Sequence, residues 1–118
     1  MDLKDAVLQF SYAERAKSEL IIVSALTGSL EGYKGDERTG ARRMLSSVSG
    51  AVSSELAFAS QATSNEDFTR AVSLLNEAMS RIDGEDYSGA SETIGRAISA
   101  VTTAAQRAWQ VLSDNELV

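Results

Sequence analysis

The stretch from Asp36 to Ala62, DERTGARRMLSSVSGAVSSELAFASQA, decides the fold of this chain. Its apolar residues recur at steps of three and four residues, which places them along one face of a single long helix. They are Ala41, Met44, Leu45, Val48, Ala51, Val52, Leu56, Phe58, Ala59 and Ala62. Because an apolar face of this length is costly to expose to water, we expect other helices to cover it.

Glu55 interrupts the apolar face of this helix. It lies between Val52 and Phe58, where the pattern calls for an aliphatic side chain. Burying a carboxylate is costly unless it is paired or protonated. Two interpretations stay open. Glu55 lies at the rim, in water or bonded to Tyr12, Ser11 or Lys17, or it is the polar anchor of a pocket inside the bundle.

Length and composition predict one soluble domain covering residues 1–118. The chain is 43% hydrophobic, which is ordinary for a globular protein, and no stretch is apolar enough to suggest a membrane span. The N-terminal residues show no signal-peptide pattern, so we expect a cytoplasmic protein. Cysteine and histidine are absent, which excludes disulfides, thiolate or imidazole metal sites and most catalytic templates.

The formal net charge of −6 makes the protein acidic, with most of the negative charge in the C-terminal half. A surface of this sign repels phosphate backbones, so nucleic acid is not an expected partner.

Three further segments have helical periodicity. They cover residues 2–28, 64–82 and 86–113, with Asp2, Ser64 and Asp86 as predicted N-caps. A glycine-rich turn at residues 28–40 precedes the central helix, whose predicted N-cap is Asp36. Four apolar-faced helices joined by fairly short connections predict an all-α fold, an up-down-up-down antiparallel four-helix bundle.

The first helix carries apolar residues on two sides, which indicates two neighbours. One stripe comprises Leu3, Ala6, Val7, Phe10, Ala13, Leu20, Ile21 and Ala25. The opposite side holds a candidate oligomer surface, made of Leu8, Tyr12, Ile22, Val23 and Leu26. Left uncovered, these side chains would form a large apolar patch, so the sequence favours a homo-oligomer that uses this helix. The alternative is that helices of the same bundle cover both sides.

A basic cluster at the first turn is a candidate anion site, comprising Lys34, Arg38, Arg42 and Arg43. Glycines, free backbone amides at a helix start and several cations together suit an anion. The alternative is that these side chains face water or pair with acidic residues at the same end of the bundle.

A candidate ligand pocket follows from the antiparallel topology, which places most of the large aromatic residues near one end. It comprises Glu55, Phe10, Glu14, Phe58, Phe68 and Trp109. The same residues can also form nothing more than a packed aromatic core.

The sequence therefore favours a non-enzymatic helical-bundle interaction or regulatory protein that acts through helix faces and binds itself or another protein. The alternative is a bundle that binds or sequesters a small ligand at the basic cluster or around Glu55. An enzyme using Glu14 and Glu55 ranks third. No catalytic residue, cofactor or metal site is indicated.

Overall fold

Nearly the whole chain is helical. The computed structural model describes residues 1–117, and in this range four α-helices follow one another with one short 3₁₀ turn. The elements are α1 (Leu3–Ser29), η1 (Leu30–Gly32), α2 (Gly35–Thr63), α3 (Glu66–Asp83) and α4 (Tyr87–Asp114). The chain contains no proline, which is consistent with uninterrupted helices of this length.

Three of the helices begin with a side-chain cap. Asp2, Asn65 and Asp86 each accept a hydrogen bond from a backbone amide in the first turn of α1, α3 and α4, respectively. At α4 the amide belongs to Gly89, and a Cβ atom there would collide with the Asp86 carboxylate. The cap of α4 therefore depends on a glycine. The N-cap residue of α2 is Lys34, which makes no side-chain cap bond.

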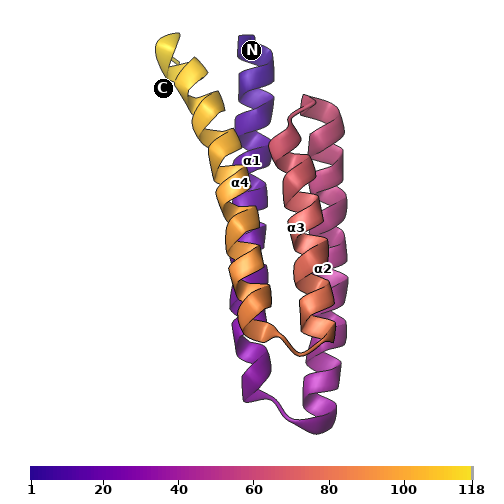
Figure 1. Ribbon diagram of the computed structural model, residues 1–118. Helices are drawn as coiled ribbons and strands as arrows, with labels where there is room; N and C mark the ends of the chain where they lie inside the picture. Colours follow the sequence, from indigo (N-terminus) through magenta and orange to yellow (C-terminus); the bar gives the residue numbers. More distant parts are fainter. Residues whose placement is uncertain (118) are drawn as a thin grey trace.

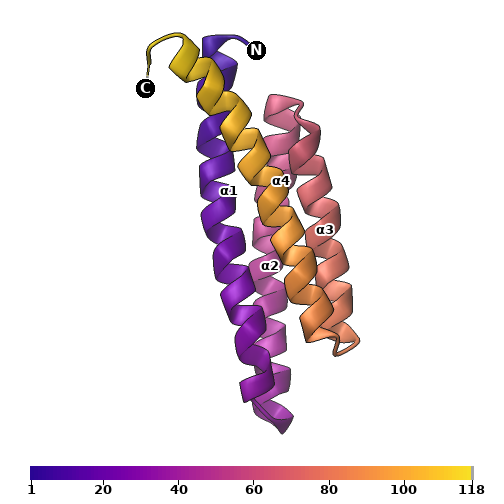
Figure 2. The same ribbon diagram turned by 60° about the vertical axis from the view of Figure 1, so that its left-hand side comes forward.

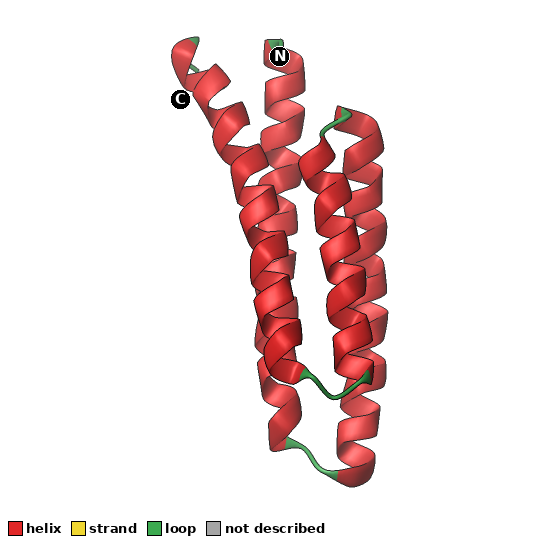
Figure 3. Cartoon of the chain, in the orientation of Figure 1, coloured by secondary structure: helices red, strands yellow, loops and turns green. Residues whose placement is uncertain are grey.

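The helices form an antiparallel up-down-up-down bundle, as the sequence predicts (Figures 1 and 3). Each helix packs against its neighbours in the chain, and α4 returns to close the ring on α1. The contacts of α4 with α1 and α3 are the most extensive, and those of α2 with α1 are the least. The bundle measures 54 × 22 × 18 Å.

Both termini lie at one end of the bundle, where α1 and α4 extend past the α2–α3 hairpin (Figures 1 and 2). At the other end, the α1–α2 turn extends beyond the α3–α4 turn. Within residues 1–117, no helix is both long and apolar enough to cross a lipid bilayer.

The inward-facing residues of α1 follow regular steps of three and four. They are Ala6, Gln9, Ala13, Ala16, Leu20, Val23 and Thr27. This row differs from the stripe expected from the sequence, because Leu3, Val7 and Ile21 are exposed whereas Gln9 and Thr27 are buried. Thr27 is accommodated because its hydroxyl donates to the Val23 carbonyl within the helix.

The inward-facing row of α2 is Leu45, Ser49, Val52, Leu56 and Ala59. Met44, Val48 and Phe58, which the sequence places on the same face, are exposed instead. The apolar residues of α2 thus form two adjacent rows, and only one of them faces the core. The predicted single face was wrong because a helical wheel locates both rows but not the neighbour that covers each.

Two predicted helix starts shift by one or two residues. α2 begins before Asp36, which lies in its first turn. Ser64 is not the cap of α3 but ends α2 in a left-handed conformation, with φ of 54°. Asn65 takes the capping role, since the sequence offers two adjacent polar residues and only the second has extended backbone.

Candidate functional site

The outer side of α1 that faces α2 carries a second row of residues at steps of three and four. Leu8, Ile22 and Leu26 in this row are 37%, 55% and 41% exposed. Tyr12 is half-buried against the core, and Arg15 and Glu19 occupy the middle of the row. Apolar side chains in this row are spaced like the contact positions of a coiled coil, but no helix of the chain covers them.

α2 carries a matching outer row that runs beside the first one. Met44 and Phe58 are 73% and 65% exposed, and Val48 is 38% exposed. We call the two rows together the α1–α2 face. It comprises Leu8, Tyr12, Arg15, Glu19, Ile22 and Leu26 from α1, and Met44, Val48, Ala51, Glu55, Phe58 and Ala62 from α2.

Two hollows lie between these rows, because α1 and α2 pack less extensively than the other neighbours. The larger has a volume of about 440 Å³ and is lined by residues that include Tyr12, Arg15 and Phe58. The second, of about 320 Å³, is lined by residues that include Ile22 and Val48. Glu55 borders both hollows. The two hollows therefore lie along the groove between the rows and share Glu55 as a border.

A charge cluster of Arg15, Glu19 and Glu55 bridges this groove. The Arg15 Nη2 atom lies 2.6 Å from Glu55 Oε1, and its Nε atom lies 3.2 Å from Glu19 Oε1. Burial raises the pKa of the Glu19 carboxyl above its ordinary value of 4.5, and a hydrogen bond with Glu55 raises this pKa further. Arg15 acts in the opposite direction. One cation serves two carboxylates, so the cluster carries an excess negative charge.

Glu55 therefore lies at the rim of the core and not inside it. Its side chain is 43% exposed and its partner is Arg15. The sequence correctly singles out this carboxylate but assigns it other partners, Lys17 or Tyr12. The difference arises because Glu55 belongs to the outer row of α2, which lies opposite the outer row of α1.

The predicted aromatic pocket is not assembled. Phe68 is fully buried in the core. Phe10, Glu14 and Trp109 line a different groove, between α1 and α4, together with Lys17. Only Phe58 accompanies Glu55. The six residues lie at similar heights along the bundle axis in the predicted topology, but the order of the helices around the ring puts them on different sides.

Four of the five residues of the predicted oligomer surface lie together on one face of the structure. Leu8, Tyr12, Ile22 and Leu26 belong to the α1–α2 face. Val23 is fully buried, so it cannot contribute to a surface. The two isoleucines next to it, Ile21 and Ile22, are exposed by 50% and 55%, but only Ile22 borders the groove.

The predicted anion cluster is largely engaged within the protein. Arg38 donates to the backbone carbonyls of Leu30, Glu31 and Tyr33, and its guanidinium lies 5.7 Å from the centre of the Tyr87 ring. Arg42 lies 3.6 Å from Asp83. Arg38 therefore stabilises the first turn. Of the four residues of the cluster, Lys34 and Arg43 are exposed and form no ion pair within residues 1–117.

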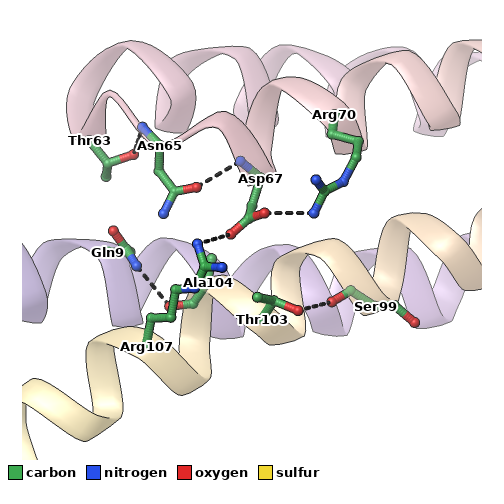
Figure 4. Close-up of polar contacts among 9 residues, drawn as sticks. All are labelled: Gln9, Thr63, Asn65, Asp67, Arg70, Ser99, Thr103, Ala104 and Arg107. Atoms are coloured by element: carbon green, nitrogen blue, oxygen red, sulfur yellow. Dashed lines mark hydrogen bonds and ion pairs between the residues drawn. The ribbon is translucent and has the colours of Figure 1, made fainter.

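A polar junction between α1, α3 and α4 was not foreseen from the sequence (Figure 4). The side chain of Asp67 is only 6% exposed and lies 2.6 Å from Arg70 and 3.7 Å from Arg107. Nearby, the buried Gln9 amide donates to the Ala104 carbonyl over 2.8 Å. The sequence predicts only a helix cap at this position, at Ser64, and gives no indication of the partners of Asp67.

Within residues 1–117, no group of three or more acidic side chains is placed to hold a metal ion. The chain matches no known protein family, and neither a characterised protein nor a solved structure shows significant similarity to it.

Proposed function

We propose that this chain is a non-enzymatic interaction protein that self-associates through the α1–α2 face. The observation that carries the proposal is the pair of uncovered apolar rows on two neighbouring helices. Single exposed apolar residues are normal on a protein surface, whereas contiguous apolar patches rimmed by polar residues mark interaction sites.

The spacing of the rows also favours a helical partner. Leu8, Tyr12, Ile22 and Leu26 recur at the steps that characterise helix-in-groove recognition and coiled coils. Two such rows, with a groove between them, form one side of an interface between two pairs of helices. A second pair of helices placed on them would cover the apolar side chains and fill both hollows.

An enzymatic role has less support. The carboxylates proposed as an acid–base pair, Glu14 and Glu55, border different grooves of the bundle. Glu55 is also paired with Arg15, whose Nη2 atom lies 2.6 Å from its Oε1 atom. The positions of Glu14 and Glu55 therefore do not resemble those of two acid–base groups that converge on one substrate.

A small-ligand role is the second candidate, and the larger hollow is the observation that favours it. Its volume of about 440 Å³ lies within the range of small-molecule sites, and Tyr12 and Phe58 provide aromatic walls. Glu55 would then bind a cationic group. This role predicts that a small aromatic cation binds to the monomer and that Glu55→Gln abolishes the binding.

Sedimentation equilibrium with a pair of matched variants tests the proposed self-association. Ile21 and Ile22 are adjacent, of the same type and similarly exposed, but only Ile22 belongs to the face. We expect a defined oligomer at about 100 μM, which Ile22→Asp weakens by at least about tenfold and Ile21→Asp leaves nearly unchanged. A wild-type monomer at this concentration, or equal effects of both variants, would overturn the proposal.

A further inference from the structure

The outer row of α1 reads almost the same from either end. Its central residues are Arg15 and Glu19, of opposite charge. Tyr12 and Ile22 lie at equal distances in sequence from their midpoint, and so do Leu8 and Leu26. Moving outwards from the centre, the row passes from charged to apolar residues in both directions.

The outer row of α2 is centred at the same height. The Arg15–Glu55 ion pair and the two hollows align the helices, with Phe58 beside Tyr12 and Val48 beside Ile22. The midpoint between Ala51 and Glu55 is thus level with the midpoint of the α1 row. Val48 and Phe58 lie at equal distances in sequence from this point, and so do Met44 and Ala62. In each of these pairs one side chain is large and the other is smaller.

Two rows that share one centre fit a two-fold axis that crosses both helices at that height. Resting on the self-association proposed above, we infer that a second copy of the chain binds face to face about this axis, with α1 antiparallel to α1 and α2 antiparallel to α2 of the second copy. Such a contact is self-complementary and closes at a dimer.

Charge complementarity supports this register. Antiparallel pairing of α1 places Arg15 opposite Glu19 of the second copy, and Glu19 opposite Arg15 of the second copy. The Glu19 side chain is only 25% exposed in the single chain, and a covering helix removes more of its water. A partly desolvated carboxylate requires a cation, and the second copy supplies one.

The alternative is a parallel arrangement, in which α1 covers α2 of the second copy. It gives Glu19 no additional cation. Arg15 would then face Glu55, which it already binds within its own chain. Glu19 would face Ala51 and would lose water without gaining a cation. The antiparallel register is therefore the one in which Glu19 gains a second cation, Arg15 of the second copy, beside the Arg15 of its own chain.

Engineered disulfides test the register, because the chain has no native cysteine. Leu8 and Leu26 are both exposed, so cysteine at either position leaves the core intact. Mixing Leu8→Cys chains with Leu26→Cys chains should give a disulfide-linked heterodimer on oxidation. Neither variant alone should crosslink, since identical positions would lie about 27 Å apart along an antiparallel pair.

Crosslinking of Leu26→Cys with Met44→Cys chains instead, or crosslinking of either α1 variant with itself, would overturn the register. The self-association would survive such a result provided that Ile22→Asp still abolishes it. A wild-type protein that stays monomeric removes both proposals, so the two failures are distinguishable.

A charge exchange gives an independent test of Arg15 and Glu19 as specificity determinants. Arg15→Glu and Glu19→Arg should each reduce self-association by about tenfold, because like charges then face one another across the axis. Mixing the two variants should restore association to within about threefold of wild type, since each position again faces an opposite charge. Melting curves of each variant at low concentration verify folding. A mixture that associates no better than its components would overturn the assignment.

Discussion

The two sides of α1 differ sharply. Towards α4 the helix presents small residues, such as Ala6 and Ala13, and the contact is extensive. Towards α2 it presents Tyr12, Ile22 and Leu26, and the contact is open, with two hollows and a charge cluster. Several large apolar residues of α1, such as Ile21 and Ile22, are therefore exposed, whereas Ala6 and Ala13 are fully buried. Close helix approach depends on side-chain size as well as on hydrophobicity.

The largest expected effect comes from enlarging a residue on the closed side. Ala104 is fully buried in α4, whereas Ala51 is exposed on the α1–α2 face. Ala104→Leu should lower the free energy of unfolding by about 1–3 kcal/mol, because the packed helices must separate. Ala51→Leu should change it by less than about 0.5 kcal/mol. Urea denaturation of the dilute monomers measures both, and equal losses would show that the two sides do not differ in packing.

A smaller effect is expected at the polar contact on the closed side. Gln9→Met keeps the size of the side chain but removes its buried hydrogen bond to the Ala104 carbonyl. This change should cost about 0.5–1.5 kcal/mol of unfolding free energy. Gln61→Met on the exposed surface of α2 is the matched control and should be nearly neutral. If both variants melt at the wild-type temperature, Gln9 does not stabilise the α1–α4 contact.

On the open side, loss of the Arg15–Glu55 pair should matter less. The Arg15 side chain is 70% exposed, so Glu55→Gln should destabilise the monomer by at most about 1 kcal/mol. The difference should shrink in about 1 M salt, where exposed charges are screened. Thermal melts at low and high salt provide the measurement. A large, salt-independent loss would mean that Glu55 is part of the core.

The smallest effect is a pH dependence at Glu19. Because burial and Glu55 raise its pKa, the folded chain binds this proton more tightly than the unfolded chain. Stability should therefore fall as pH rises from about 4.5 through the raised pKa of the folded state. Glu19→Gln should flatten this dependence of stability on pH, and the variant should melt no lower than wild type at pH 7. The control is Glu14→Gln, at an exposed residue, which should keep the wild-type dependence. A wild-type slope of the opposite sign would contradict the assignment.

The sequence predicts the helices and their order well, because caps and apolar periodicity are local properties. α3 shows this most clearly, since Phe68, Ala71 and Leu75 recur at steps of three and four residues and are all buried. α3 has a single apolar side, so only one rotation of the helix about its axis buries that side. α1 and α2 each have two apolar rows, and the sequence does not show which row a neighbour covers. The sequence therefore predicts that Val48 faces the core, whereas Val48 is exposed and its neighbour Ser49 is buried.

The candidate site could be predicted only in part for the same reason. The pattern identified Glu55 as an anomaly and Leu8, Ile22 and Leu26 as uncovered residues. The partner of Glu55 was missed because the height at which α1 meets α2 depends on the loop and on the start of α2 at Gly35. Asp67 was missed because its cations come from two different helices.

Gly89 has a consequence for the mutational tolerance of the chain. Glycines inside helices are usually safe places to introduce alanine, and Gly50 and Gly95 have open space where a methyl group would lie. Gly89 also lies inside a helix, yet a methyl group there would displace the Asp86 carboxylate from the Gly89 amide that it caps. A library that replaces every helical glycine should therefore enrich alanine at residues 50 and 95 and deplete it at residue 89.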